Sequence, residues 1–183
     1  MNRREQVKTV LLYGVFVCYI LLVLKILFLS RVSLFELFSS QREINRSFNL
    51  IPFHSIMEYL SGGTEEVKRF SYGNVVGNII LFIPLGLYLP LLRKDKRIRT
   101  NLLFVLAASL FAEIVQGLFG IGASDVDDLI LNCAGGFIGI LAYKLVLLIF
   151  RDEKKVRTAI LIPSVIVGLP MIFYYLFLIR MKF

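Results

Sequence analysis

The chain has 183 residues, a length that allows about one domain. Hydrophobic residues make up 57% of it and charged residues 19%, with a mean hydropathy of +0.77. Because a soluble domain is about half apolar and about a quarter charged, this composition excludes an ordinary soluble protein. We expect residues 1–183 to form a single integral membrane domain. The net charge of +8 lies in clusters beside apolar stretches, which indicates membrane orientation and argues against nucleic-acid binding.

Several apolar stretches are long enough to cross a bilayer, which takes about 20 residues per helix. They cover residues 7–29, 75–92, 101–121, 129–150 and 159–179. The first stretch is not followed by a small-residue cleavage site, so we expect a retained anchor and not a signal peptide. The sequence therefore predicts an all-α integral membrane protein, a bundle of five transmembrane helices.

Basic residues gather before the first stretch, between the second and third, and between the fourth and fifth. They are Arg3, Arg4 and Lys8, then Arg93, Lys94, Lys96, Arg97 and Arg99, then Arg151, Lys154, Lys155 and Arg157. Positively charged loops stay in the cytoplasm. The pattern predicts an N-terminus inside the cell and a C-terminus outside.

The segment between the first two stretches then lies outside, and it contains two amphipathic sequences. "VSLFELFSS" (32–40) surrounds Glu36 with large apolar residues, which suits a short helix lying in the interface. "HSIMEYLSGG" (54–63) places Ser55 and Glu58 at the spacing of a capping box. We expect short interfacial helices here, with an irregular loop as the alternative.

Polar residues interrupt the three middle stretches at spacings that share a helix face. The shared faces are those of Asn74 with Asn78, of Ser109 with Glu113 and Gln116, and of Asp128 with Asn132. An ionised Glu113 would cost about 2.5–3.5 kcal/mol in the bilayer centre. We therefore expect Glu113 to face the bundle, to find a partner, or to keep its proton.

These polar residues fall at one depth. With a rise of about 1.5 Å per residue, Asn78, Glu113, Gln116 and Asn132 lie roughly 5–12 Å below the outer helix ends. The sequence thus predicts a polar pocket open to the outside, whose substrate-binding candidates are Asn78, Glu113, Gln116, Asp127, Asp128 and Asn132. The alternative is that such groups only join helices by hydrogen bonds of about 1 kcal/mol each, the favoured role for Asn74 and Asn132 taken singly. Asp125 and Glu65–Glu66 are expected to be solvated surface charges.

Small residues and prolines predict how the helices pack. Gly135 and Gly139 continue the face of Asp128 and should let a neighbouring backbone approach. Pro84 cannot donate a backbone hydrogen bond, so we expect a kink there, with Gly86 as a further bending or contact point.

Four motifs, in order and spacing, resemble the VanZ-like family over residues 49–145. They are "NLIPF" (49–53), "GNIILFIPLG" (77–86), "EIVQ" (113–116) and "DVDDLILNCAGGFIG" (125–139). The positions that match the family's motifs are Asn49, Pro52, Phe53, Asn78, Pro84, Gly86, Glu113, Gln116, Asp128, Asn132 and Gly135. The resemblance implies a multi-pass protein of the plasma membrane in a Gram-positive bacterium, a cell-envelope protein that alters susceptibility to teicoplanin.

One position departs from the family pattern. Some relatives carry an arginine shortly before the Asp-rich motif, where this chain has "GIGAS" (120–124). If that arginine pairs with a phosphate or an acid, Lys68 or Arg69 is the candidate replacement here.

Three functions remain open from the sequence. The first is binding or transport of a lipid-linked cell-wall precursor, with membrane lipids as further partners. The second is an enzyme in which Glu113 and Asp128 act as general acid and base or hold a divalent cation. Against it, the single histidine, His54, suits an interfacial turn, the free cysteines Cys18 and Cys133 suit small buried positions, and no cofactor motif is present. The third is an assembly protein or small-molecule sensor; the oligomeric state is left open.

Overall fold

The computed structural model describes residues 2–29, 47–54, 57, 64–93 and 95–175. The chain falls into two compact units, one of Met1–Ser40 with Lys144–Phe183 and the other of Gln41–Tyr143. The expected interfacial helix at 32–40 lies outside the described residues, as does most of the one at 54–63. The single membrane domain and the two interfacial helices therefore stay predictions.

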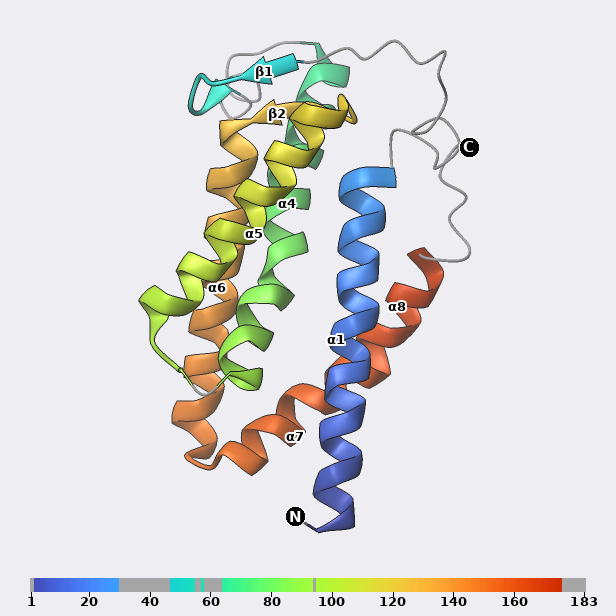
Figure 1. Ribbon diagram of the computed structural model, residues 1–183, viewed down its shortest axis with the longest axis vertical. Helices are drawn as coiled ribbons and strands as arrows, with labels where there is room; N and C mark the ends of the chain where they lie inside the picture. Colours follow the sequence, from blue (N-terminus) through green and yellow to red (C-terminus); the bar gives the residue numbers. More distant parts are fainter. Residues whose placement is uncertain (1, 30–46, 55–56, 58–63, 94, 176–183) are drawn as a thin grey trace. The chain divides into compact units, whose positions relative to one another are not determined.

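The second unit consists of three long helices and a small sheet. The helices are α4 (Glu65–Leu92), α5 (Ile98–Phe119) and the larger part of α6 (Val126–Phe150). Strands β1 (Ser47–Asn49) and β2 (Ala123–Asp125) pair in parallel, with Phe48 opposite Ser124. Figure 1 shows this pair at the end of the unit where α5 leads through β2 into α6. Segments this short show no periodicity, and the all-α prediction did not include them.

Local capping explains where α4 and α5 begin and end. The side chain of Thr64 accepts a hydrogen bond from the Val67 N–H, which starts α4. Asp95 accepts the Arg97 N–H at 2.9 Å just before α5, and this bond holds the pKa of the Asp95 carboxyl below its usual value. Gly120 ends α5 with a φ of 57°, a left-handed conformation that glycine adopts without steric cost.

Helices α4 and α6 touch at glycines. A Cβ atom on Gly86 would lie 1.9 Å from the Gly136 carbonyl oxygen, and one on Gly139 would lie 2.0 Å from that of Ile83. A Cβ on Gly135 would lie 2.1 Å from the Ile79 carbonyl oxygen. Only hydrogen fits at these points, so the two backbones are in direct contact, as in other small-residue membrane interfaces.

The first unit contains α1 (Arg3–Leu29), the last residues of α6 and a C-terminal helical segment. That segment runs through α7 (Glu153–Pro163), a π-helical turn η1 (Ser164–Gly168) and α8 (Leu169–Phe173). Helix α1 contacts all three parts of it. The π turn lies between Pro163 and Pro170, where missing backbone N–H groups disturb the regular hydrogen-bond ladder.

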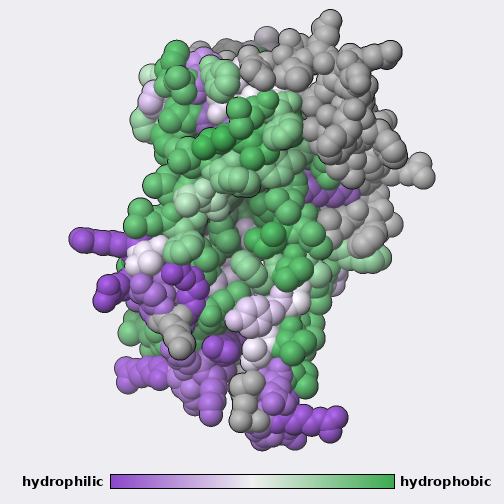
Figure 2. Space-filling model, viewed as in Figure 1, coloured by the Kyte–Doolittle hydropathy of each residue, from purple (hydrophilic) through white to green (hydrophobic). Residues whose placement is uncertain are grey.

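The prediction of five membrane-spanning helices is confirmed by length and composition. The candidates are Arg3–Leu29, Glu65–Leu92, Ile98–Phe119, Val126–Phe150 and Glu153–Phe173. Large apolar side chains are exposed along these helices, as the green surface of Figure 2 shows. The second helix begins ten residues before the predicted 75–92, because charged residues such as Glu65 and Lys68 form its first turns. It runs on through Pro84, and the predicted kink stays a prediction.

Substitutions at these glycines should separate the α4–α6 contact from general effects of glycine replacement. We expect Gly86→Ala and Gly139→Ala each to destabilise the protein by about 1–3 kcal/mol, because the added methyl group overpacks the contact. Gly77→Ala, in the same helix as Gly86 but with nothing within 4 Å of an added Cβ, is the matched control. Thermal unfolding of the detergent-purified protein measures the difference. Equal melting temperatures for Gly139→Ala and Gly77→Ala would contradict the contact.

Candidate functional site

Carboxylates from α5, β2 and α6 meet at the end of the second unit that carries the strands. We call Glu113, Asp125, Asp127 and Asp128 the acidic cluster. Its members lie on α5, at the end of β2 and in the first turn of α6, and asparagines of β1 and α4 bind two of them. The sharp turn at Gly120 brings the end of α5 next to the start of α6 and so assembles the cluster.

Glu113 lies inside this unit. The residue is only 6% exposed. Its Oε2 accepts a hydrogen bond from the backbone N–H of Asp125 at 2.8 Å. The carboxylate therefore fastens α5 to the end of β2. Glu113 thus faces the bundle and has a partner, two of the outcomes expected for it.

Asp125 connects two further elements of this unit, β1 and the start of α6. Its Oδ2 accepts the Asn49 side-chain amide at 3.1 Å, and its Oδ1 accepts the Asp127 N–H at 2.9 Å, which starts α6. The expectation of a solvated surface charge is wrong for Asp125, because this half-buried residue joins β1 to α6. Asn49 also accepts the Ile51 N–H at 3.2 Å, which turns the chain toward Pro52.

Asp127 holds the end of the "NLIPF" segment. Its residue is 1% exposed, and its Oδ1 accepts a short hydrogen bond from the Phe53 N–H. Phe53 has a φ of 66°, a left-handed conformation that is unfavourable for an aromatic residue. Such strain persists only where the surroundings impose it and is frequent at functional sites. The hydrogen bond to Asp127 holds the Phe53 N–H in this conformation.

Asp128 binds α4. Its Oδ1 accepts the side-chain amides of Asn74 at 3.0 Å and of Asn78 at 2.6 Å, and Asn78 also donates to Asn74 at 3.3 Å. All three residues are half-buried. The glycine contact between α4 and α6 brings the two asparagine amides within hydrogen-bond distance of Asp128. These hydrogen bonds therefore depend on the close packing of the two helices.

Asn132 lies one turn further along α6 and belongs to a different contact. Its amide donates to the Ser109 hydroxyl at 2.9 Å, and both residues are buried. Its Oδ1 has no hydrogen-bond partner among the residues that the structure describes. Gln116 is half-buried one turn after Glu113. The structure thus joins Asp128 to Asn78 and Glu113 to Asp125, while Asn132 pairs with Ser109.

The acidic cluster has the chemistry of an acceptor site. The donors in the hydrogen bonds described above are side-chain amides and backbone N–H groups, which carry no charge. Among the described residues, no three His, Cys, Asp or Glu side chains gather in a way that could hold a metal ion. Such a site suits ligand groups that donate hydrogen bonds, including hydroxyl, amide and ammonium groups.

An open hollow of about 520 Å³ lies at the start of α4. It is lined by Glu65, Glu66, Lys68, Arg69 and Tyr72. Lys68 and Arg69 are the residues that the sequence proposed as replacements for the missing arginine. They precede Asn74 by only one to two helical turns, so basic groups and the Asn74–Asn78 pair lie along the same helix.

Comparison with known proteins agrees with these motifs. The model of the VanZ/LLP1 family matches residues 16–150, a wider range than the motifs alone cover. The chain is 32% identical over 128 residues to protein VanZ of Enterococcus faecium, an alignment that covers 70% of this chain and 71% of that protein. No solved structure matches. The chain belongs to the VanZ/LLP1 family.

Proposed function

We propose that this chain binds or moves a lipid-linked cell-wall precursor at the outer surface of the bacterial plasma membrane and thereby alters susceptibility to teicoplanin. Family membership and the similarity to protein VanZ support the role in the cell envelope. The acidic cluster supports the kind of ligand. The single observation that carries the proposal is that Glu113, Asp128 and two asparagines, from three helices, lie at the same end of this unit. A hollow of mixed charge, lined by both basic and acidic residues, lies one to two turns before Asn74 on α4.

The orientation rests on the basic loops. Arg97 and Arg99 stand at the start of α5, whereas Glu113 and the Gly120 turn stand near its end. At about 1.5 Å per residue, this helix places Glu113 roughly 20–25 Å and the Gly120 turn roughly 30–35 Å from the basic loop, distances comparable to the thickness of the hydrocarbon core. With the basic loop in the cytoplasm, the cluster faces the outside and the C-terminus is also external.

The charges divide the ligand between two subsites. Acidic carboxylates repel phosphate but accept hydrogen bonds from sugar hydroxyls, peptide amides and amines. Asp128, with Asn78, would contact this donor-rich part of the precursor. Lys68 and Arg69 would bind its phosphate or carboxylate groups in the neighbouring hollow.

Glu113 would act as a protonatable switch. In the ionised state its carboxylate attracts the Asp125 N–H strongly, and this bond keeps β2 next to α5. Protonation would weaken that bond and loosen the connection through Asp125 to Asn49. A proton or a bound ligand would then change how firmly the "NLIPF" segment covers the site.

Replacement of Glu113 by glutamine tests the switch. Glu113→Gln keeps the shape and an acceptor oxygen, so we expect the protein to fold but to bind lipid-linked precursor at least about tenfold more weakly, the loss typical of one charged hydrogen bond. Binding to purified protein in liposomes is the measurement. Glu153→Gln, the same change at an exposed glutamate in the first turn of α7, is the control. Unchanged precursor binding in Glu113→Gln would overturn the role of this carboxylate.

Asp128→Asn distinguishes a ligand-binding site from a set of polar residues that only join the helices by hydrogen bonds. The substitution keeps an oxygen that can accept from Asn74 and Asn78 but removes the negative charge, so we expect resistance to teicoplanin to fall at unchanged protein level per cell. Ser109→Ala removes an interhelical hydrogen bond outside the acidic cluster and should lower stability by roughly 0.6 kcal/mol without a matching loss of resistance. Resistance is compared with membrane abundance for each variant. If resistance simply follows abundance in both, the polar residues only hold the bundle together.

A further inference from the structure

The first unit contains a second hollow, of about 400 Å³, which shares no residue with the acidic cluster. Its polar rim is formed by Lys8 of α1 with Lys154, Lys155 and Thr158 at the start of α7. Its apolar part is formed by Phe150 at the end of α6 and by Ala159 and Ile162 of α7. A groove with cations at one end and hydrocarbon along the rest has the two-part chemistry of a phospholipid.

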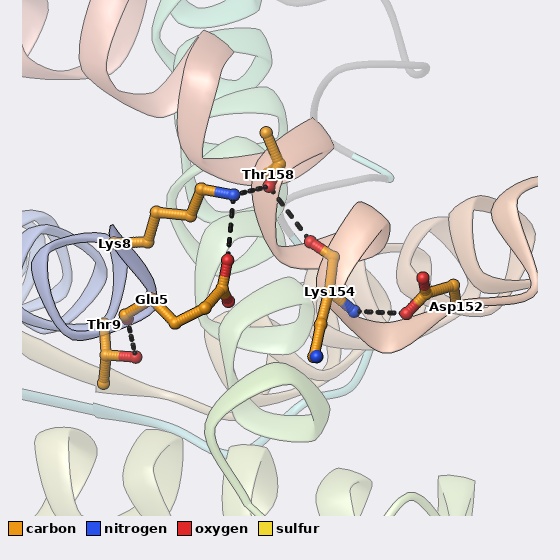
Figure 3. Close-up of polar contacts among 6 residues, drawn as sticks. All are labelled: Glu5, Lys8, Thr9, Asp152, Lys154 and Thr158. Atoms are coloured by element: carbon orange, nitrogen blue, oxygen red, sulfur yellow. Dashed lines mark hydrogen bonds and ion pairs between the residues drawn. The ribbon is translucent and has the colours of Figure 1, made fainter. Parts of the chain in front are cut away.

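The rim is organised by hydrogen bonds. Lys8 donates to the Thr158 hydroxyl at 3.0 Å and forms an ion pair with Glu5 at 3.2 Å, as Figure 3 shows. The Thr158 hydroxyl in turn donates to the Lys154 carbonyl oxygen at 3.0 Å. These bonds fix the end of α1 against the first turns of α7 and so give the groove a defined wall.

The positive charge that remains belongs to Lys154 and Lys155. Glu5 offsets the charge of Lys8, whereas both lysines of α7 are exposed and neither forms an ion pair among the described residues. Asp152 is occupied as the N-cap of α7, accepting the Lys154 N–H at 2.9 Å. An anion at this rim would therefore meet two ammonium groups that no ion pair among the described residues occupies, beside a helix N-terminus.

The apolar part has the length and position for an acyl chain. Lys154 and Ile162 are eight residues apart on α7, roughly 12 Å along the helix axis, which is the distance from a headgroup into the upper hydrocarbon. Phe150 and Ile162 are 42% and 52% exposed, so they present apolar surface that lipid would cover.

We propose that this groove binds an anionic glycerophospholipid of the leaflet that surrounds the start of α1. Lys154 and Lys155 bind its phosphate, Lys8 and Thr158 fix the rim, and Phe150 and Ile162 contact one acyl chain. Charge complementarity favours this occupant: a free phosphate would leave the apolar walls in contact with water, and a lipid without net charge would leave the lysines without a counter-charge.

The test uses the full chain, purified in a non-ionic detergent, with lipid binding followed by native mass spectrometry. Phosphatidylglycerol, phosphatidylcholine and glycerol phosphate are titrated separately. We expect tight binding of phosphatidylglycerol only. The double variant Lys154→Gln/Lys155→Gln should weaken it by about thirtyfold, the loss expected for two lysines beside an anionic headgroup. Arg3→Gln/Arg4→Gln removes the same number of charges from the start of α1. It should change binding less than about twofold, because neither arginine lines the groove and charges separated from the headgroup by water are screened.

A second variant distinguishes binding of the whole lipid from binding of its headgroup alone. Ile162→Asp places a charge on the exposed apolar wall and should weaken phosphatidylglycerol binding at least about tenfold, because an acyl chain cannot solvate it. Unchanged lipid binding in Ile162→Asp, or glycerol phosphate binding as tightly as the lipid, would overturn the lipid site in favour of an anion site. Equal losses in the lysine and arginine double variants would show that these residues act only as general basic charge.

Discussion

The hydrogen bond from the Asp125 backbone to the Glu113 carboxylate is the constraint on which the polar end of this protein depends. A carboxylate inside a membrane helix is costly unless it is paired or protonated. Here its acceptor oxygen lies 2.8 Å from a backbone N–H of β2, a donor that cannot rotate away. The bond therefore fixes the chain direction after Gly120 as well as satisfying the acid. Once β2 is fixed, Asp125 can bind Asn49 and start α6, and each of these contacts places another polar group.

The apolar half of the arrangement is equally necessary. Asp128 can bind Asn74 and Asn78 only because α4 and α6 are in backbone contact at Gly86, Gly135 and Gly139. In a membrane no hydrophobic effect drives helices together, so close packing of small residues must supply the association. The polar bonds then select the register of the two helices, since sliding by one turn would separate the amides from the carboxylate. Packing and polar recognition specify the same arrangement.

Much of this could be predicted from the sequence, because membrane helices leave strong signals. The five apolar stretches and the pairs of polar residues four apart indicated the spans and the faces of α4 and α6. The strands could not be predicted in the same way, since three residues have no measurable period. Asp125 was misjudged because its partner, Asn49, lies far away in the sequence and only the parallel pairing brings the two together. The early start of α4 was missed for the opposite reason: hydropathy excludes Glu65 and Lys68, although a helix can extend beyond the bilayer into water.

The pairing of β1 with β2 also has a consequence for the order of assembly. Asn49 leaves the ribosome 76 residues before Asp125, an interval of about 4–15 seconds at ordinary rates of synthesis. During that interval α4 and α5 can insert, whereas the "NLIPF" segment has no strand to join and Glu113 has no backbone donor. The polar end is thus completed only when Asp125 and the first turn of α6 are synthesised, and quality control of a nascent chain would meet α4 and α5 before β1 has a strand to pair with.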